Sequence, residues 1–348
     1  MERVAVGAAQ AAVRPARAGW FDALAPLVER LPGPALAYYA VTSAILLGWM
    51  ATVAEANGKP FGAGYALFGL QVVMPVALGH HFTDVARSAL RRFRTLLDVD
   101  DARFAEIEHD FLTLSPGATW VATVVALTLG AMAVFLSPEE WFGGYATSYD
   151  ALLAGIAPVI FLFVIPFGPF ITRSIRQLVL VTRLHAAAPV VDPLRPGPTY
   201  AFSDFTVRVG LAMLVYGYGW LVADIETITA SPVAYLLDAA FMAIAVAFFV
   251  LPLWGMHRRL VAGRDALLDS ADARLQTVIA ELHRRAEALD LRDADPLNKT
   301  IGSLIAERDV ILKAPTWPWR PGTLNAFATL LAAPVILFII TRVLGRFV

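Results

Sequence analysis

The stretch AFFVLPLWGMHRRL, residues 247–260, contains the end of an apolar run and the start of a charged one. The apolar run, residues 233–254, has the roughly 20 residues that an α-helix needs to cross the hydrocarbon core of a bilayer. Downstream, Arg258 to Leu291 is charged and has leucine every seven residues, at positions 268, 275, 282 and 289. The sequence therefore predicts a membrane helix that continues into a helix outside the membrane.

The composition of the whole chain agrees with a membrane protein. Of its 348 residues, 58% are hydrophobic and 16% are charged, and the mean hydropathy is +0.62. Soluble domains have about 45–50% apolar and about 25% charged residues. The chain has no cysteine, which excludes disulfides, thiol catalysis and cysteine-ligated metal sites. We expect an all-α polytopic membrane protein.

Seven apolar runs are long enough to be membrane spans. They cover residues 35–53, 64–82, 119–136, 152–171, 207–223, 233–254 and 324–341. Arginine-rich, helix-patterned segments follow the second, fourth and sixth runs, so we expect helix extensions that form a layer on one side of the membrane.

The distribution of Lys and Arg predicts the orientation. All of the 28 Lys and Arg residues except Lys59, Arg342 and Arg346 fall on the same side of the predicted spans. Because cytosolic loops carry the excess of positive charge, we expect a cytosolic N-terminus and an external C-terminus in a plasma or inner membrane.

Four segments follow from this layout. Residues 1–34 would form a cytosolic N-terminus with a short amphipathic helix from Trp20 to Leu31, lying either on the membrane surface or on a cytosolic domain, with Asp22 on its polar side. Residues 35–256 would form a six-helix bundle with extensions, and residues 257–323 a cytosolic hairpin with an elbow. Residues 324–348 would form the terminal membrane helix.

The third segment has a helical hairpin pattern. The leucine seam of 258–291 has two clean heptads, too few for an independent coiled coil, whereas residues 296–313 offer a matching apolar face. Residues 314–323 (APTWPWRPGT) contain three prolines and cannot continue a helix. We expect a hairpin that doubles as a subunit interface or binds a cytosolic partner through 258–313, followed by an elbow whose tryptophans lie at the inner membrane interface.

Polar residues in and around the spans are the candidate functional residues. The last span has small and polar residues at helical spacing, which either line a water path or allow close helix packing: Asn325, Thr329, Ala332 and Ala333. The short outer loops are acidic and would concentrate cations: Glu139, Glu140, Asp150, Asp224 and Glu226.

A histidine pair marks the inner end of the second span. On a helix, His80 and Asp84 share a face, and His81 lies close to it. Two ligands on one face do not make a metal site, so the alternatives are a pH-dependent switch and polar anchoring at the interface. No nucleotide-binding, hydrolase or metalloprotease motif occurs in the sequence, and we expect no enzyme activity, no cofactor and no nucleic-acid binding.

The layout resembles that of insect odorant- and gustatory-receptor channels. These have a cytosolic N-terminus, seven spans, a cytosolic anchor layer made of helix extensions, and a last helix split into a cytosolic and a pore-lining piece. The resemblance covers nearly the whole chain as architecture, but the family's last-helix signature residues are absent, so it implies no ligand site. PTWPW (315–319) and PTYAFS (198–203) are similar to strings in uncharacterised bacterial multi-span proteins, and that likeness implies no activity.

These observations predict a homo-oligomeric, channel-like protein that conducts cations, is gated by a ligand and has a pore lined by the last helix. Two alternatives stay open. One is a membrane sensor or scaffold whose cytosolic helices bind a partner, and the other is a small-molecule carrier with a site near Pro166 and Pro169 in the fourth span.

Overall fold

The computed structural model describes residues 17–187, 194, 197–223, 232–289, 292, 294–319, 322, 325, 327–329, 331 and 332. Within these, the side chains of residues 140, 199, 221, 222, 232–241 and 294 are not described. The described residues form helices and connecting turns, without a strand. Each predicted apolar run that the structure describes in full lies in a helix, because a backbone without water partners must satisfy its own hydrogen bonds.

The helices follow one another along the chain with short connections. Their bounds are η1 (Phe21–Ala23), α1 (Leu24–Glu29), α2 (Ala35–Ala56), α3 (Ala63–Phe93), η2 (Arg94–Leu96), α4 (Asp101–Leu112), α5 (Pro116–Phe135), α6 (Pro138–Phe142), α7 (Tyr149–Ala151), a π-helical turn η3 (Leu152–Ile156), α8 (Ala157–Ala187), η4 (Pro198–Tyr200), α9 (Ser203–Ala223), α11 (Pro232–Glu287) and α12 (Ala294–Leu312).

Five helical stretches of the described chain are long and apolar enough to cross a membrane: 35–56, 63–96, 101–135, 149–187 and 242–287. The all-α, multi-pass membrane class predicted from the sequence is therefore confirmed. The count of seven is not, since α9, which carries Asp204 and Arg208 near its start, is not among the five. Most of the predicted last span lies outside the described residues.

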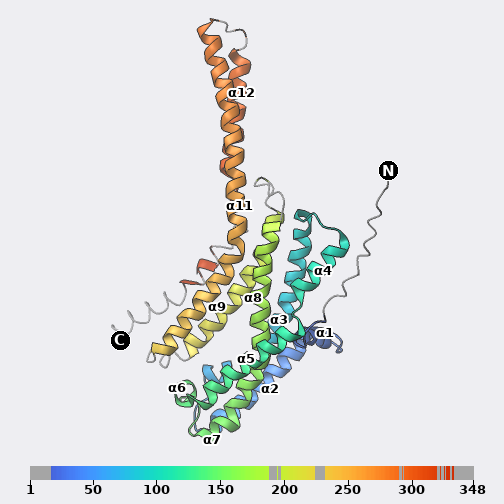
Figure 1. Ribbon diagram of the computed structural model, residues 1–348. Helices are drawn as coiled ribbons and strands as arrows, with labels where there is room; N and C mark the ends of the chain where they lie inside the picture. The colour runs from blue at the N-terminus through green and yellow to red at the C-terminus, as the bar shows by residue number, and fades with distance from the viewer. Residues whose placement is uncertain are drawn as a thin grey trace, which may run out of the picture.

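Figure 1 shows the arrangement of these helices. The lower part is a bundle in which α8 packs between α5 and α3, α2 packs on α3, and α9 packs on α11. The extensions of α3 and α8 rise from this bundle together, and α4 packs against both of them. Buried aromatic residues fill the space between these extensions and the start of α9, among them Phe93, Phe111, Phe202 and Phe205.

Helix α11 rises far above the rest of the molecule and has α12 beside its upper part (Figure 1). We call Arg258–Glu287 of α11 together with α12 the stalk. At 1.5 Å per residue, its 30 residues of α11 extend about 45 Å. The two helices are antiparallel, because Asp272 binds Arg308 while Arg274 binds Glu307. Beyond Leu260 at its base, only Ala271 and Ile311 of the described stalk residues are fully buried, since α11 and α12 cover one another on one side only.

Candidate functional site

The residues that connect the stalk to the last segment form a column of stacked rings. His257 of α11 stacks on Trp317 with ring centroids 3.8 Å apart, and Trp317 stacks on Trp319 at 4.4 Å. Trp319 stacks on Phe249 of α11 at 4.8 Å, and Phe249 stacks on Phe327 at 3.8 Å. The tryptophans thus hold the elbow against α11, and the stacked rings connect His257 at the base of the stalk to Phe327.

Hydrogen bonds fix the same elbow at its start. Nδ1 of His257 donates to the carbonyl oxygen of Thr316 at 2.9 Å, because a carbonyl can only accept. Gly322, beyond the tryptophans, has a φ of +87°, a left-handed conformation that glycine adopts at no steric cost. The chain therefore turns at a defined place before it enters the last segment.

The described part of the last segment has one face on the bundle and one face away from it. Phe327 is buried against α9, where a Cβ on Gly210 would lie 3.2 Å from its ring, and the hydroxyl of Tyr218 donates to the carbonyl of Leu331 at 3.0 Å. Asn325, Thr329 and Ala332, which the sequence places on one stripe, are all exposed. Ala333 lies outside the described residues.

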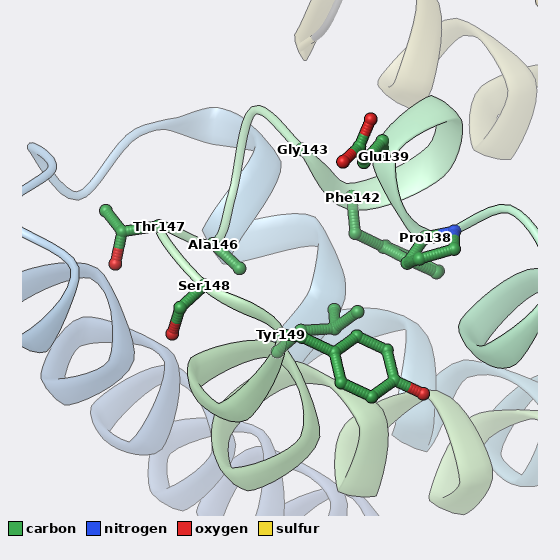
Figure 2. A pocket seen from close by; sticks show the side chains of 9 residues that line it. Pro138, Glu139, Phe142, Gly143, Ala146, Thr147, Ser148 and Tyr149 are labelled. Carbon is green, nitrogen blue, oxygen red and sulfur yellow. The ribbon is translucent and has the colours of Figure 1, made fainter.

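The outer acidic residues are only partly placed by the structure. Glu139 and Asp150 are exposed, the side chain of Glu140 is not described, and Asp224 and Glu226 lie outside the described residues. Glu139 lines a cavity of about 440 Å³ between α6 and α7 (Figure 2), together with Pro138, Phe142, Gly143, Ala146, Thr147, Ser148, Tyr149 and Leu152. Asp150 does not line it, so this cavity has one described acid rather than a ring of them.

The histidine pair and Asp84 do not come together. His80 binds Glu29 of α1 through Nε2 at 2.9 Å and the hydroxyl of Tyr39 through Nδ1 at 3.1 Å. His81 accepts from Arg208 of α9 at 3.0 Å, and Asp84 pairs with Arg87. No group of three metal-ligating side chains exists among the residues that the structure describes. The i, i+4 spacing is present, but the two histidines bind residues of other helices and Asp84 pairs with Arg87 on α3 itself.

A buried ion pair that the sequence reasoning missed lies close by. The sequence places Asp22 on the polar side of the N-terminal helix, but its side chain is not solvated: the Asp22 and Arg173 side chains are 5% and 7% exposed and lie 2.8 Å apart. The other Asp22 oxygen accepts from the backbone N–H of Leu114 at 2.6 Å. Charged groups are buried at low cost only when they are paired and hydrogen-bonded in this way.

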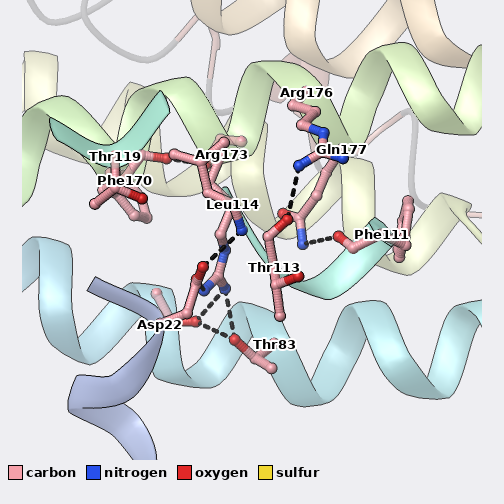
Figure 3. A network of polar contacts seen from close by, with 12 residues as sticks. Asp22, Thr83, Phe111, Thr113, Leu114, Thr119, Phe170, Arg173, Arg176 and Gln177 are labelled. Carbon is pink, nitrogen blue, oxygen red and sulfur yellow. Dashed lines mark hydrogen bonds and ion pairs between the residues drawn. The ribbon is translucent and has the colours of Figure 1, made fainter. Parts of the chain in front are cut away.

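Arg173 completes its own hydrogen bonds with α3 (Figure 3). Its second terminal nitrogen donates to the carbonyl of Gly79 at 2.7 Å and to Thr83 Oγ1 at 2.5 Å, and its guanidinium lies over the ring of Phe21. Asp22, Thr83 and Arg173 with their partners, which we call the clamp, join four separate parts of the chain. The clamp therefore fastens the N-terminal helical segment onto α3, α8 and the connection between α4 and α5.

The next turn of α8 supports the same crossing. Arg176 donates to the carbonyl of Thr113 at 2.8 Å, and Gln177 donates to that of Phe111 at 3.1 Å (Figure 3). The last carbonyls of a helix have no partner within it, so these bonds complete the end of α4. The only sequence signal for the clamp was Arg173 itself, an arginine two residues past an apolar run, which is also the ordinary position of a charge at a membrane boundary.

His185, near the end of the α8 extension and 14 residues past the predicted fourth span, is a further buried titratable group. Its Nδ1 donates to the backbone carbonyl of Pro252 in α11 at 3.1 Å. Its Nε2 is buried without a hydrogen-bond partner among the described residues. Burial, with a smaller contribution from Arg259, lowers the pKa of His185 to about 4. The imidazole is therefore neutral at pH 7 and joins the α8 extension to α11.

Comparison of the chain with protein-family models, with curated proteins and with solved structures finds no match.

Proposed function

We propose that this protein is a homo-oligomeric, cation-conducting channel with seven membrane helices, whose last helix lines a central pore and whose stalk and elbow control it. In this proposal the last helix crosses the membrane, as the apolar run 324–341 predicts. Helix α9, which runs antiparallel to its neighbour α11, is then the fifth span.

The observation that carries the proposal is the exposed face of the last segment. Phe327 and Leu331 point to the chain's own α9 and α11, so Asn325, Thr329 and Ala332 face outward from the subunit. An amide or hydroxyl facing lipid costs free energy, because no partner there replaces the lost water. A second copy of the chain across a water-filled path would give the polar groups of Asn325 and Thr329 both hydrogen-bond partners and water. An isolated subunit in lipid would give them neither.

The ring column gives this pore a means of control. His257, Trp317, Trp319, Phe249 and Phe327 connect the base of the stalk to the segment that bears the stripe. Rigid stacked contacts have few intermediate arrangements, so a shift of α11 repositions Phe327 rather than being absorbed between them. A ligand or partner that acts on the stalk would in this way change the pore.

The test is purified protein in planar bilayers, combined with measurement of the particle's mass. We expect discrete conductance with cations as the main current carrier, and a mass that is a multiple of one chain. Thr329→Leu should change the single-channel conductance, whereas Val124→Leu on the exposed face of α5 should not. A monomeric particle without conductance under any condition would overturn the proposal.

A second function is favoured by the stalk, which exposes apolar side chains away from the bundle. Ile305, Val310 and Leu312 of α12 are between 44% and 59% exposed. In a sensor or scaffold, this surface would bind a cytosolic protein. That function predicts a partner that co-purifies with the whole chain and is lost when residues 258–313 are deleted, with no conductance in either case.

A further inference from the structure

Two adjoining surface cavities lie at the predicted inner membrane boundary, one along α3 alone and the other between α3 and α9. Their volumes are about 450 Å³ and about 370 Å³, and they share Asp84, Ser88 and Arg92. Together they form one groove, which we call the basic groove. Its lining residues are His81, Asp84, Val85, Arg87, Ser88, Arg91, Arg92, Asp204 and Arg208.

The groove has more positive than negative groups. Four arginines line it against two aspartates, and Glu108 of α4 is a further acid that contacts Arg87 and Arg91. Arg92 pairs with Asp204 at 3.4 Å, a loose contact for an ion pair. Even with all three acids counted, one positive charge is left without a negative partner.

Arg208 holds that uncompensated charge. It has no carboxylate partner among the described residues, and its bond goes to the Nε2 of His81 at 3.0 Å. The hydroxyl of Ser88, two turns along the same face of α3 from His81, also has no protein partner in the part of the chain that the structure describes. A guanidinium and a hydroxyl beside one cavity are the donors that bind a phosphate group.

The surroundings of Arg208 distinguish a lipid from a soluble anion. Leu211 and Val215 follow it on the same face of α9 at i+3 and i+7, toward the membrane, and are 37% and 57% exposed. An acyl chain would lie on these two residues while its headgroup phosphate reaches Arg208. On the other side, Arg91 and Arg92 extend the groove toward the cytosol.

We propose that the basic groove binds the phosphate headgroup of an anionic phospholipid, with Arg208 as the main anchor, Ser88 and Arg92 as further donors, and Leu211 and Val215 as the contact for the acyl chain. Basic pockets between membrane helices on the cytosolic side are suited to such headgroups, and each arginine near the membrane surface contributes a favourable charge interaction. The bound lipid would bridge α3 and α9, and its phosphate would neutralise the positive charge of Arg208.

Native mass spectrometry of the whole purified chain tests this with three probes: phosphatidylglycerol, phosphatidylcholine and inorganic phosphate. We expect phosphatidylglycerol to bind about tenfold or more tightly than phosphatidylcholine, and a large excess of inorganic phosphate not to displace it. Arg208→Gln should weaken phosphatidylglycerol binding about tenfold, and Arg208→Lys should retain most of it.

Arg274→Gln in the stalk is the matched control, since it removes one exposed arginine outside the groove. It should leave lipid binding unchanged. Equal binding of the two lipids, wild-type affinity in Arg208→Gln, or an equal loss in Arg274→Gln would each overturn the proposal. Displacement of the lipid by inorganic phosphate would also contradict it, because the groove would then be a site for a soluble anion.

Discussion

The clamp and the stalk contain the same kind of ion pair in opposite surroundings. In the clamp, Arg173 and Asp22 lie 2.8 Å apart at 7% and 5% exposure, with further hydrogen bonds on both groups. In the stalk, Arg308 and Asp272 lie 2.7 Å apart at 39% and 41% exposure. The distances between the charged atoms are nearly identical in the two pairs. We therefore expect the two pairs to contribute differently to stability because of their different exposure to water.

The molecule thus has two kinds of region. In the clamp each polar group has a fixed partner within the protein, whereas in the stalk water can replace a partner that is removed. The clamp holds the N-terminal helix, α3, α5 and α8 in one arrangement. The stalk has a two-helix seam and exposed pairs, so it deforms at low cost. In the proposed channel, a rigid bundle around the pore and a deformable stalk outside it are the arrangement that gating needs.

Loss of the clamp carboxylate has the largest expected effect. Asp22→Ala leaves the guanidinium of Arg173 buried without a counter-charge, which costs about 3–5 kcal/mol of unfolding free energy. Unfolding of the detergent-solubilised protein by a denaturing detergent measures it, with Asp272→Ala as control. If the two variants lose equal stability, the proposed difference between the regions is wrong.

Acidification has the next largest effect. The folded-state pKa of His185, about 4, is below the ordinary value of 6.5, so the unfolded chain binds a proton between these values and the folded chain does not. The contribution of His185 to the free energy of unfolding is therefore fully present above about pH 6.5. It is lost as the pH falls toward 4, and the total loss is about 3 kcal/mol.

Melting temperatures measured from pH 7.5 down to pH 4.5 check this. The wild type should lose stability steadily below pH 6.5, and His185→Gln, whose amide can still donate to Pro252, should lose less over the same range. Parallel curves for the two proteins would show that another group causes the pH dependence.

A pair of glycine substitutions compares packing in the two regions. A Cβ at Gly168 of α8 would overlap the carbonyl oxygen of Ala122 in α5, so Gly168→Ala should cost about 1–3 kcal/mol. Gly302 of α12 has no atom within 4 Å of that position, and Gly302→Ala should stabilise the stalk by about 0.5–1 kcal/mol. Unfolding measurements on both variants should show opposite signs, and equal signs would contradict the packing described here.

Removal of a stalk ion pair has the smallest expected effect. Arg308→Ala should change the unfolding free energy by less than about 1 kcal/mol, because both partners are rehydrated when the pair is lost. Salt should reduce the effect further. A loss as large as that of Asp22→Ala would mean that this surface of the stalk is covered in the assembled protein.

The sequence predicts those parts of the structure that depend on hydrophobic runs. The run 35–53 lies within α2, and the run 152–171 lies within η3 and α8. The spacing of Asn325, Thr329 and Ala332 also predicts one shared face, and all three are exposed. In these places the local pattern of apolar and polar residues is enough to predict the helix and its exposed face.

The clamp and the contacts of the two histidines could not be predicted, because Asp22, His80 and His81 bind partners that are distant in sequence. Asp22 reads as a polar-face residue by periodicity, yet Arg173 and Leu114, more than 90 residues away, make its burial favourable. His80 and Asp84 share a face as expected, but Glu29 and Arg87 take them as partners. A buried charge has no hydrophobic pattern of its own.

The measurement that tests the central proposal most directly uses the absence of cysteine from the chain. Thr329→Cys puts a single thiol on the exposed stripe, and Val124→Cys puts one on the exposed apolar face of α5 as control. In intact membranes, we expect Thr329→Cys to react with a charged, membrane-impermeant thiol reagent and to cross-link to a second copy, whereas Val124→Cys should do neither. Equally unreactive thiols without cross-linked chains would contradict a pore lined by the last helix.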